Sequence, residues 1–115
     1  MTMHIARKKD AKRIQISDTM VAYEYLVLDS SLHGALTELS GRYPEKGRVV
    51  NEKCAELAYI VKGSGKLIIE GEEVEFKEGD QLFIAPGERY YWVATALMFM
   101  PCSPAWYPEQ HKEVD

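Results

Sequence analysis

The feature of this sequence that most constrains its fold is a two-residue hydrophobic period, which recurs in short segments along the chain. Such alternation places apolar side chains on one face of a strand, and no segment of a dozen residues shows the 3.6-residue stripe of an amphipathic helix. Glycines or a Pro-Gly pair separate most of the segments at strand-like intervals. The expected strands are 20–28, 35–40, 56–62, 66–70, 74–77, 80–85, 89–94 and 96–100. The sequence therefore predicts an all-β protein.

The chain has 115 residues, which is enough for one domain with a single core. Eight or nine short strands are expected to close into a barrel or pack as a sandwich, because closure removes open strand edges. Two tight hairpins are predicted, one through KGSGK at 62–66 and one through EGEE at 70–73. We expect a basic N-terminal arm at 1–13, a core barrel at 34–100 and an irregular, proline-rich C-terminal arm at 101–115 that packs its aromatic residues over the barrel or a partner.

Charge and hydropathy exclude several function classes. The net charge of −4 argues against nucleic-acid binding, which needs an excess of Lys and Arg over one face. No apolar run approaches the length that spans a bilayer, and the basic start of the chain lacks the apolar stretch of a secretory signal. We therefore expect a cytoplasmic protein, with Cys54 and Cys102 as free thiols. The basic cluster at 7–13 is interpreted as a solvated arm rather than a phosphate or partner site.

Two segments of the sequence resemble the motifs of the cupin superfamily. The first motif of that family ends in a glutamate, six residues and a glycine, and Glu56 has this spacing to Gly63. The second motif contains two glycines at the separation of Gly79 and Gly87, although Ala85 stands where the family has a proline. The resemblance extends over roughly residues 41–100. It implies a small single-domain cupin with a double-stranded β-helix, or jelly-roll, barrel.

The resemblance also implies where such proteins hold a metal, and the usual histidine ligands are missing from those positions. Tyr90 stands in place of the second-motif histidine, and Glu52 or Asn51 in place of one from the first motif. The three histidines of the chain lie outside both motifs: His4, His33 and His111.

A metal site therefore has to be weighed against a metal-free one. Glu52, Glu56 and Tyr90 could form an oxygen-rich site for a divalent metal such as Mn, Fe, Ni or Zn. Carboxylates without imidazole bind transition metals weakly, so we favour a site with no cofactor.

The residues at these positions still predict a polar site inside the barrel. Strand alternation directs Trp92 to the same side as Tyr90, and Glu56 to the same side as its alternate neighbours along the strand. If that side is the interior, burial should raise the pKa of Glu56. Glu56 and Tyr90 could then act as general base and general acid, or could form a structural hydrogen bond; both interpretations stay open. The aromatic rings suit stacking on a sugar, an aromatic ring or a quaternary amine, with a core or interface role as the alternative.

These observations predict a cupin that binds a small molecule, such as a sugar or another polar metabolite. The expected ligand-binding residues are Asn51, Glu52, Glu56, Tyr90 and Trp92. The alternatives are an isomerase or epimerase that uses Glu56 and Tyr90, a metal-dependent enzyme with an oxygen-rich site, and a structural dimerisation module.

A homodimer is also expected from the apolar side chains of the later strands. Phe83, Leu97 and Phe99, together with the neighbouring methionines, cannot all fit inside a small barrel that also holds a pocket. Alternate members should therefore form a second apolar surface, suited to a second copy of the chain.

Overall fold

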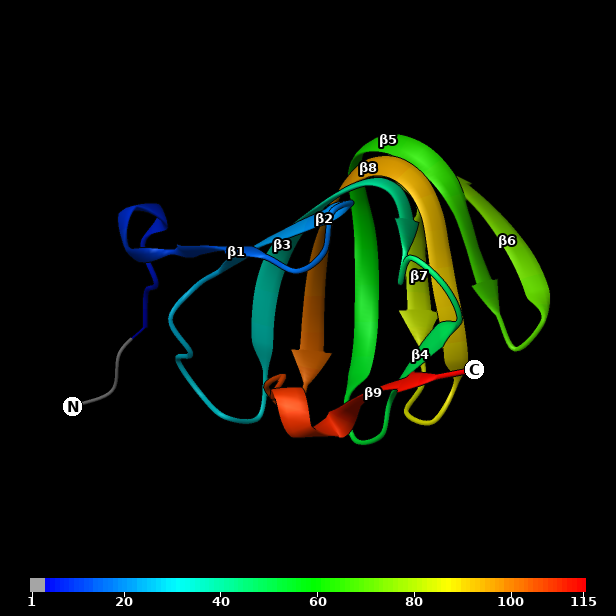
Figure 1. Ribbon diagram of the computed structural model, residues 1–115. Coiled ribbons are helices and arrows are strands. Elements are labelled where there is room, and N and C mark those ends of the chain that lie inside the picture. Colours follow the sequence, from blue (N-terminus) through cyan, green and yellow to red (C-terminus); the bar gives the residue numbers. More distant parts are fainter. Residues whose placement is uncertain (1–3) are drawn as a thin grey trace.

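The computed structural model describes residues 4–115, and this part of the chain forms nine strands and two short 3-10 helices (Figure 1). The helices are η1 (Lys8–Asp10) and η2 (Pro108–Gln110). The strands are β1 (Lys12–Gln15), β2 (Met20–Glu24), β3 (His33–Tyr43), β4 (Arg48–Asn51), β5 (Ala55–Ile69), β6 (Glu72–Lys77), β7 (Gln81–Ile84), β8 (Arg89–Ser103) and β9 (His111–Val114). The predicted all-β, jelly-roll barrel is confirmed.

Three long strands determine the shape of the barrel. β8 lies between β3 and β5 and pairs with both in antiparallel fashion, while β5 also pairs with β6 and β7. Figure 1 shows β3, β5 and β8 arching together over the top of the molecule. A strand of fifteen residues that bends in this way contributes to two sides of the barrel, so that the sheet curls around an interior space.

The predicted hairpin through 62–66 is wrong, because those residues lie in the middle of the continuous strand β5. Gly63 has a φ of +95°, and Gly65 faces β8 so closely that an added Cβ would come within 2.6 Å of the Val93 carbonyl oxygen. The two glycines therefore allow a strongly bent strand to approach its neighbour, rather than reversing the chain. The second predicted hairpin is confirmed, since β5 turns into β6 through Glu70 and Gly71.

The arms differ from the expectation in a similar way. The C-terminal arm is not wholly irregular, because β9 pairs with β4 from Arg48↔Val114 to Asn51↔His111. Proline had suggested an arm without pairing, but the prolines all precede β9 and leave its backbone free to pair. Residues 1–3 of the predicted basic arm lie outside the described residues, and β1 adds a strand to the rest of that arm.

The two faces of the long strands have different environments. Buried side chains alternate along β5 and β8, and Tyr90 and Trp92 point to the same interior face, as the strand period predicts. The interior core includes Ile60, Leu67 and Met98. The opposite face carries exposed apolar side chains: Tyr59, Val61, Phe83 and Phe99.

Candidate functional site

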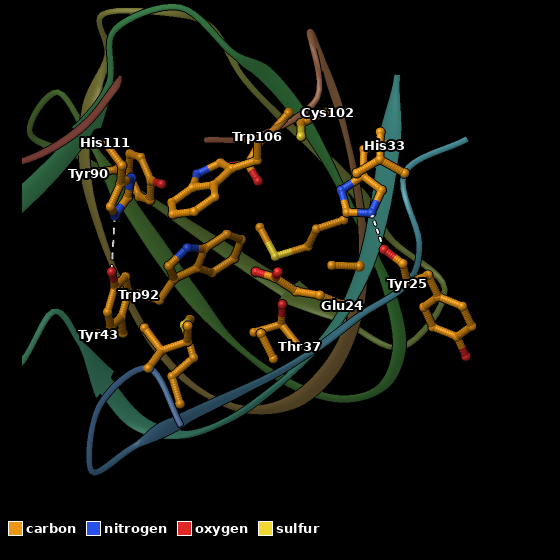
Figure 2. A pocket seen from close by; sticks show the side chains of 17 residues that line it. Glu24, Tyr25, His33, Thr37, Tyr43, Tyr90, Trp92, Cys102, Trp106 and His111 are labelled. Carbon is orange, nitrogen blue, oxygen red and sulfur yellow. Dashed lines mark hydrogen bonds between the residues drawn. The ribbon is translucent and has the colours of Figure 1, made fainter. Parts of the chain in front are cut away.

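A cavity of about 180 Å³ lies inside the barrel, and Figure 2 shows the side chains around it. Its walls come from β2, β3, β5 and β8, together with the segment that leads into β9. Three of the predicted site residues line this cavity: Glu56, Tyr90 and Trp92. Asn51 lies behind them as a fully buried residue, whereas Glu52 is exposed and does not line the cavity.

Asn51 is the centre of a hydrogen-bond network that reaches the cavity. Its amide nitrogen Nδ2 donates to Glu56 Oε1 at 2.7 Å and lies 3.3 Å from the hydroxyl of Tyr90. Its amide oxygen Oδ1 accepts from Gln110 Nε2 at 3.1 Å and lies 2.7 Å from Nδ1 of His111. Asn51 therefore joins the two predicted acid/base residues on β5 and β8 to the C-terminal segment.

The backbone determines the direction of every hydrogen bond in this network. The amide groups of Lys53 and Cys54 both donate to Oε1 of Gln110, so the other end of that side chain must be its NH₂ group. That group donates to Asn51 Oδ1, which in turn places Asn51 Nδ2 toward Glu56. Because Asn51 Oδ1 can only accept, His111 must carry its proton on Nδ1.

The tautomer of His111 connects the network to a further phenol. Nε2 of a neutral, Nδ1-protonated imidazole is an acceptor, and it lies 3.0 Å from the hydroxyl of Tyr43. Tyr43 therefore donates to His111, and both side chains line the cavity. Figure 2 shows this pair beside Tyr90, on the opposite side of the view from His33.

Burial changes the acidity of the groups in the network. It raises the pKa of Glu56 from 4.5 to about 7, although the hydrogen bond from Asn51 acts in the other direction. It also raises the pKa of Tyr43 to about 12 and holds the pKa of Tyr90 well above its ordinary value. Burial lowers the pKa of His111 below 6.5, with Glu113 opposing the change. Glu56 is thus the group of the network that can change protonation state near neutral pH.

The residues near Glu56 do not form a suitable site for the divalent metal that histidines at these positions would bind. Within residues 4–115 there is no group of three His, Cys, Asp or Glu side chains that could hold a metal ion. Asn51 directs an N–H donor, not an oxygen, toward Glu56 and Tyr90, and Glu52 lies outside the cavity. The remaining oxygen donors are one carboxylate and one phenol, which is a poor set for Mn, Fe, Ni or Zn.

Several residues that line the cavity were not among the predicted site residues. His111, Trp106 and Tyr43 lie outside both sequence motifs, and the pairing of β9 with β4 brings His111 to Asn51. The rings of Trp106 and His111 lie 5.6 Å apart at the cavity wall, which confirms that an aromatic residue of the C-terminal arm packs over the barrel. The signals available in the sequence were the adjacent aromatic residues Trp106 and Tyr107 and the segment around Tyr43 before Gly47. Neither signal has a spacing specific to a binding site.

The two cysteines are free thiols and are both buried. Burial raises the pKa of Cys54 and raises that of Cys102 to about 12, with Glu56 adding to both effects. A thiol with a raised pKa is a weak nucleophile, so neither residue is suited to covalent catalysis.

Comparison with known proteins gives a family and a set of similar folds. The family model described as "Cupin domain" matches residues 43–98. No curated protein matches the sequence. Among solved structures, a variant of Pac13 from Streptomyces with uridine shares 18% identity and a TM-score of 0.89, over 99% of this chain and 92% of that chain. Pac13 is described as a nucleoside dehydratase.

Two further solved structures are similar over most of their length. The polyketide cyclase RemF from Streptomyces resistomycificus shares 18% identity and a TM-score of 0.74, over 98% of this chain and 86% of that chain. An RmlC-like cupin from Shewanella frigidimarina shares 18% identity and a TM-score of 0.72, over 91% and 96% of the two chains. At these identities the likeness is one of fold.

The raised pKa of Glu56 predicts a specific dependence of stability on pH. Because the pKa in the folded protein, about 7, lies above the ordinary 4.5, the stabilisation from neutral Glu56 is complete below pH 4.5 and is lost as the pH rises through about 7. The unfolding free energy of the wild type relative to Glu56→Gln should therefore fall by on the order of 3 kcal/mol between pH 4.5 and about 8. Urea unfolding of both proteins across this range measures the difference.

Because the wild type and Glu56→Gln are compared, the contributions of other titrating groups to the pH dependence of stability cancel. His111, with a lowered pKa, loses stability as the pH falls, which is the opposite sign, and it is present in both proteins. A difference between the two proteins that stays constant with pH would contradict the burial of Glu56 as an acid.

Proposed function

Because this chain is a small cupin domain, we propose that it binds a small polar organic molecule, such as one with a sugar ring, inside the barrel. The observation that carries this proposal is a cavity with aromatic walls and a hydrogen-bonded polar cluster at one side. Apolar walls with a few placed polar groups are the usual composition of small-molecule sites.

The size and lining of the cavity agree with a ligand of about one ring. A cavity volume of about 180 Å³ is well above the roughly 10–15 Å³ that one water needs on a comparable measure, so the cavity has room for a small organic molecule. Trp106 supplies a flat surface on which a sugar ring can lie, and Tyr43 and Tyr90 supply hydroxyl groups. The structure of Pac13 with uridine supports a ligand that carries a sugar ring, since uridine contains a ribose.

A second candidate function is proton transfer on such a molecule, as an isomerase or epimerase requires. It is favoured by one observation, which is that Glu56 lines the cavity and has a pKa of about 7. A general base or acid works best when its pKa lies near the working pH. Tyr90, with its hydroxyl close to the same Asn51 amide group, would supply or accept the second proton.

A homodimer is part of the proposal, through the outer face of β5, β7 and β8. The register places Phe99 opposite Tyr59 and Phe83 opposite Leu57, so these side chains form one apolar surface. Phe83 is 58% exposed, and Tyr59 and Phe99 are each 43% exposed. An exposed apolar patch of this kind on a sheet favours association with a second copy.

The dimer is tested by sedimentation equilibrium at micromolar concentration. The wild type should sediment as a dimer, and Phe83→Asp should sediment as a monomer, because a buried, unpaired carboxylate at the interface is costly. Val74→Asp on β6, whose side chain is 39% exposed away from this face, serves as the matched control and should remain dimeric. A monomeric wild type would contradict the proposal.

Ligand binding can be followed through the protein's own fluorescence, because both tryptophans of the chain line the cavity. Uridine, D-ribose and D-glucose are the first probes, and at least one should give a saturable change. Tyr90→Phe should then weaken binding of that probe by about 3- to 10-fold, the effect of one hydrogen bond. Tyr91→Phe is the matched control, since Tyr91 packs under Arg42 outside the cavity and should bind like the wild type. If none of the three probes binds, or if Tyr90→Phe and Tyr91→Phe lose the same amount of affinity, the proposed site is contradicted.

The catalytic candidate makes a separate prediction in D₂O. If Glu56 transfers protons, a bound probe should exchange a carbon-bound hydrogen for deuterium in the presence of the wild type, as seen by proton NMR. Glu56→Gln should bind the same probe within about threefold but abolish the exchange. Binding without exchange in the wild type would leave a binding protein and rule out catalysis on that probe.

A further inference from the structure

The charges around the cavity all have the same sign. Two carboxylates line it, those of Glu24 and Glu56, and no lysine or arginine among residues 4–115 does. Within the same residues, the ionisable nitrogen groups of the lining are the imidazoles of His33 and His111. A phosphate or carboxylate ligand would therefore lose its hydration without gaining a permanent cationic partner.

Glu24 lines the cavity, and its cross-strand neighbour on β1 is Lys12. It lies at the end of β2 on the interior face, paired with Ala35 and diagonal to Thr37 on β3. None of the ion pairs among residues 4–115 involves Glu24. Figure 2 shows Glu24 and Thr37 together in the middle of the view, between the Tyr43–His111 pair and His33.

Two buried polar groups near Glu24 also have no partner in the described part of the chain. Thr37 is 5% exposed and Trp92 is 1% exposed, and neither side chain has a hydrogen-bond partner among residues 4–115. Among residues 4–115, no side-chain nitrogen or oxygen that is sealed from solvent lacks a partner, so the Thr37 hydroxyl and the Trp92 indole N–H open onto the cavity. Because buried polar groups are ordinarily paired, these two are available to a bound molecule.

We propose that the molecule bound in this cavity carries a primary amine, such as an amino sugar, and that its ammonium group sits between Glu24 and Thr37. This inference rests on the proposed binding function and specifies its ligand class. An ammonium group has three donors and no acceptor, which suits a carboxylate and a hydroxyl oxygen. The hydroxyl groups of the same molecule reach the Glu56–Tyr90 side, and the Trp92 N–H donates to one of them.

Two sets of matched probes test the amine directly by isothermal titration calorimetry. One set is D-glucosamine, D-glucose and D-glucuronate, and the other is tyramine, tyrosol and 4-hydroxyphenylacetate. Each set keeps one framework and presents an amine, an alcohol or an acid. In at least one set the amine should bind the wild type about tenfold more tightly than the alcohol, the effect of one charge-assisted hydrogen bond, and the acid should bind most weakly.

Glu24→Gln identifies the group responsible, because it removes the charge and keeps the size of the side chain. In this variant the amine and the alcohol should bind within about twofold of each other. Glu38→Gln is the matched control, since Glu38 lies on the same β2–β3 hairpin with its side chain exposed on the outer face, and it should keep the preference of the wild type. Circular dichroism and thermal melting verify that both variants are folded.

The outcomes separate this inference from the function on which it rests. An equal affinity for amine and alcohol, a preference that survives in Glu24→Gln, or no binding of either amine would overturn the amine proposal. If neutral probes still bind and respond to Tyr90→Phe, the proposed binding function stands without it. If no probe of any charge binds, both are contradicted.

Discussion

The pairing of β5 with β8 is the interaction on which the rest of the structure depends. It extends from Ile69↔Tyr90 to Ala55↔Ser103, and it holds the two longest strands together through a strong bend. Such a bend requires the backbones to approach closely where they curve, and Gly63 and Gly65 provide that space against Ala94 and its neighbours on β8. Because β8 is bound on its other edge by β3, its inward side chains lie at the centre of the barrel. Tyr90 and Trp92 are interior residues for this reason.

The polar side of the cavity depends on a second constraint, the orientation of Gln110. Two backbone amides hold its carbonyl oxygen, and this decides which end of Asn51 faces Glu56 and which faces His111. The consequence for Glu56 is that it has one donor, from Asn51, and is otherwise desolvated, so burial outweighs the hydrogen bond and its pKa rises. The C-terminal segment thereby determines which group of Asn51 faces the carboxylate of Glu56 on β5.

The local period of the sequence was sufficient for the all-β class and for grouping Tyr90 with Trp92 on one face, whereas the folded barrel was needed to show that this face and Glu56 point inward. The period was not sufficient where the structure that a residue favours locally differs from the contacts that it makes in the folded sheet. Glycines in KGSGK have the composition of a turn, but their close contact with β8 is a tertiary feature that only the folded sheet reveals. His111 and Glu24 were missed because each reaches the cavity through strand pairing, with β4 and with β3, that a two-residue period cannot specify. The motif resemblance was likewise silent on both, since neither lies within it.

The two carboxylates of the cavity have different environments, which suits them to the two different roles proposed above. Glu56 is nearly fully buried, and its pKa of about 7 leaves it neutral over part of the physiological range. Glu24 is half-buried, has Lys12 opposite it on β1 and is in no ion pair among the described residues. A cationic ligand at Glu24 would also stabilise the ionised form of Glu56, because a nearby positive charge lowers the pKa of a carboxylic acid. By linkage, ionised Glu56 would strengthen the binding of that cation. At a pH near 7 the filled cavity would therefore hold Glu56 as a base, and the empty cavity would hold it partly as an acid. Binding of a cationic ligand would then convert Glu56 into a proton acceptor. The binding and proton-transfer candidates would thus share one physical mechanism.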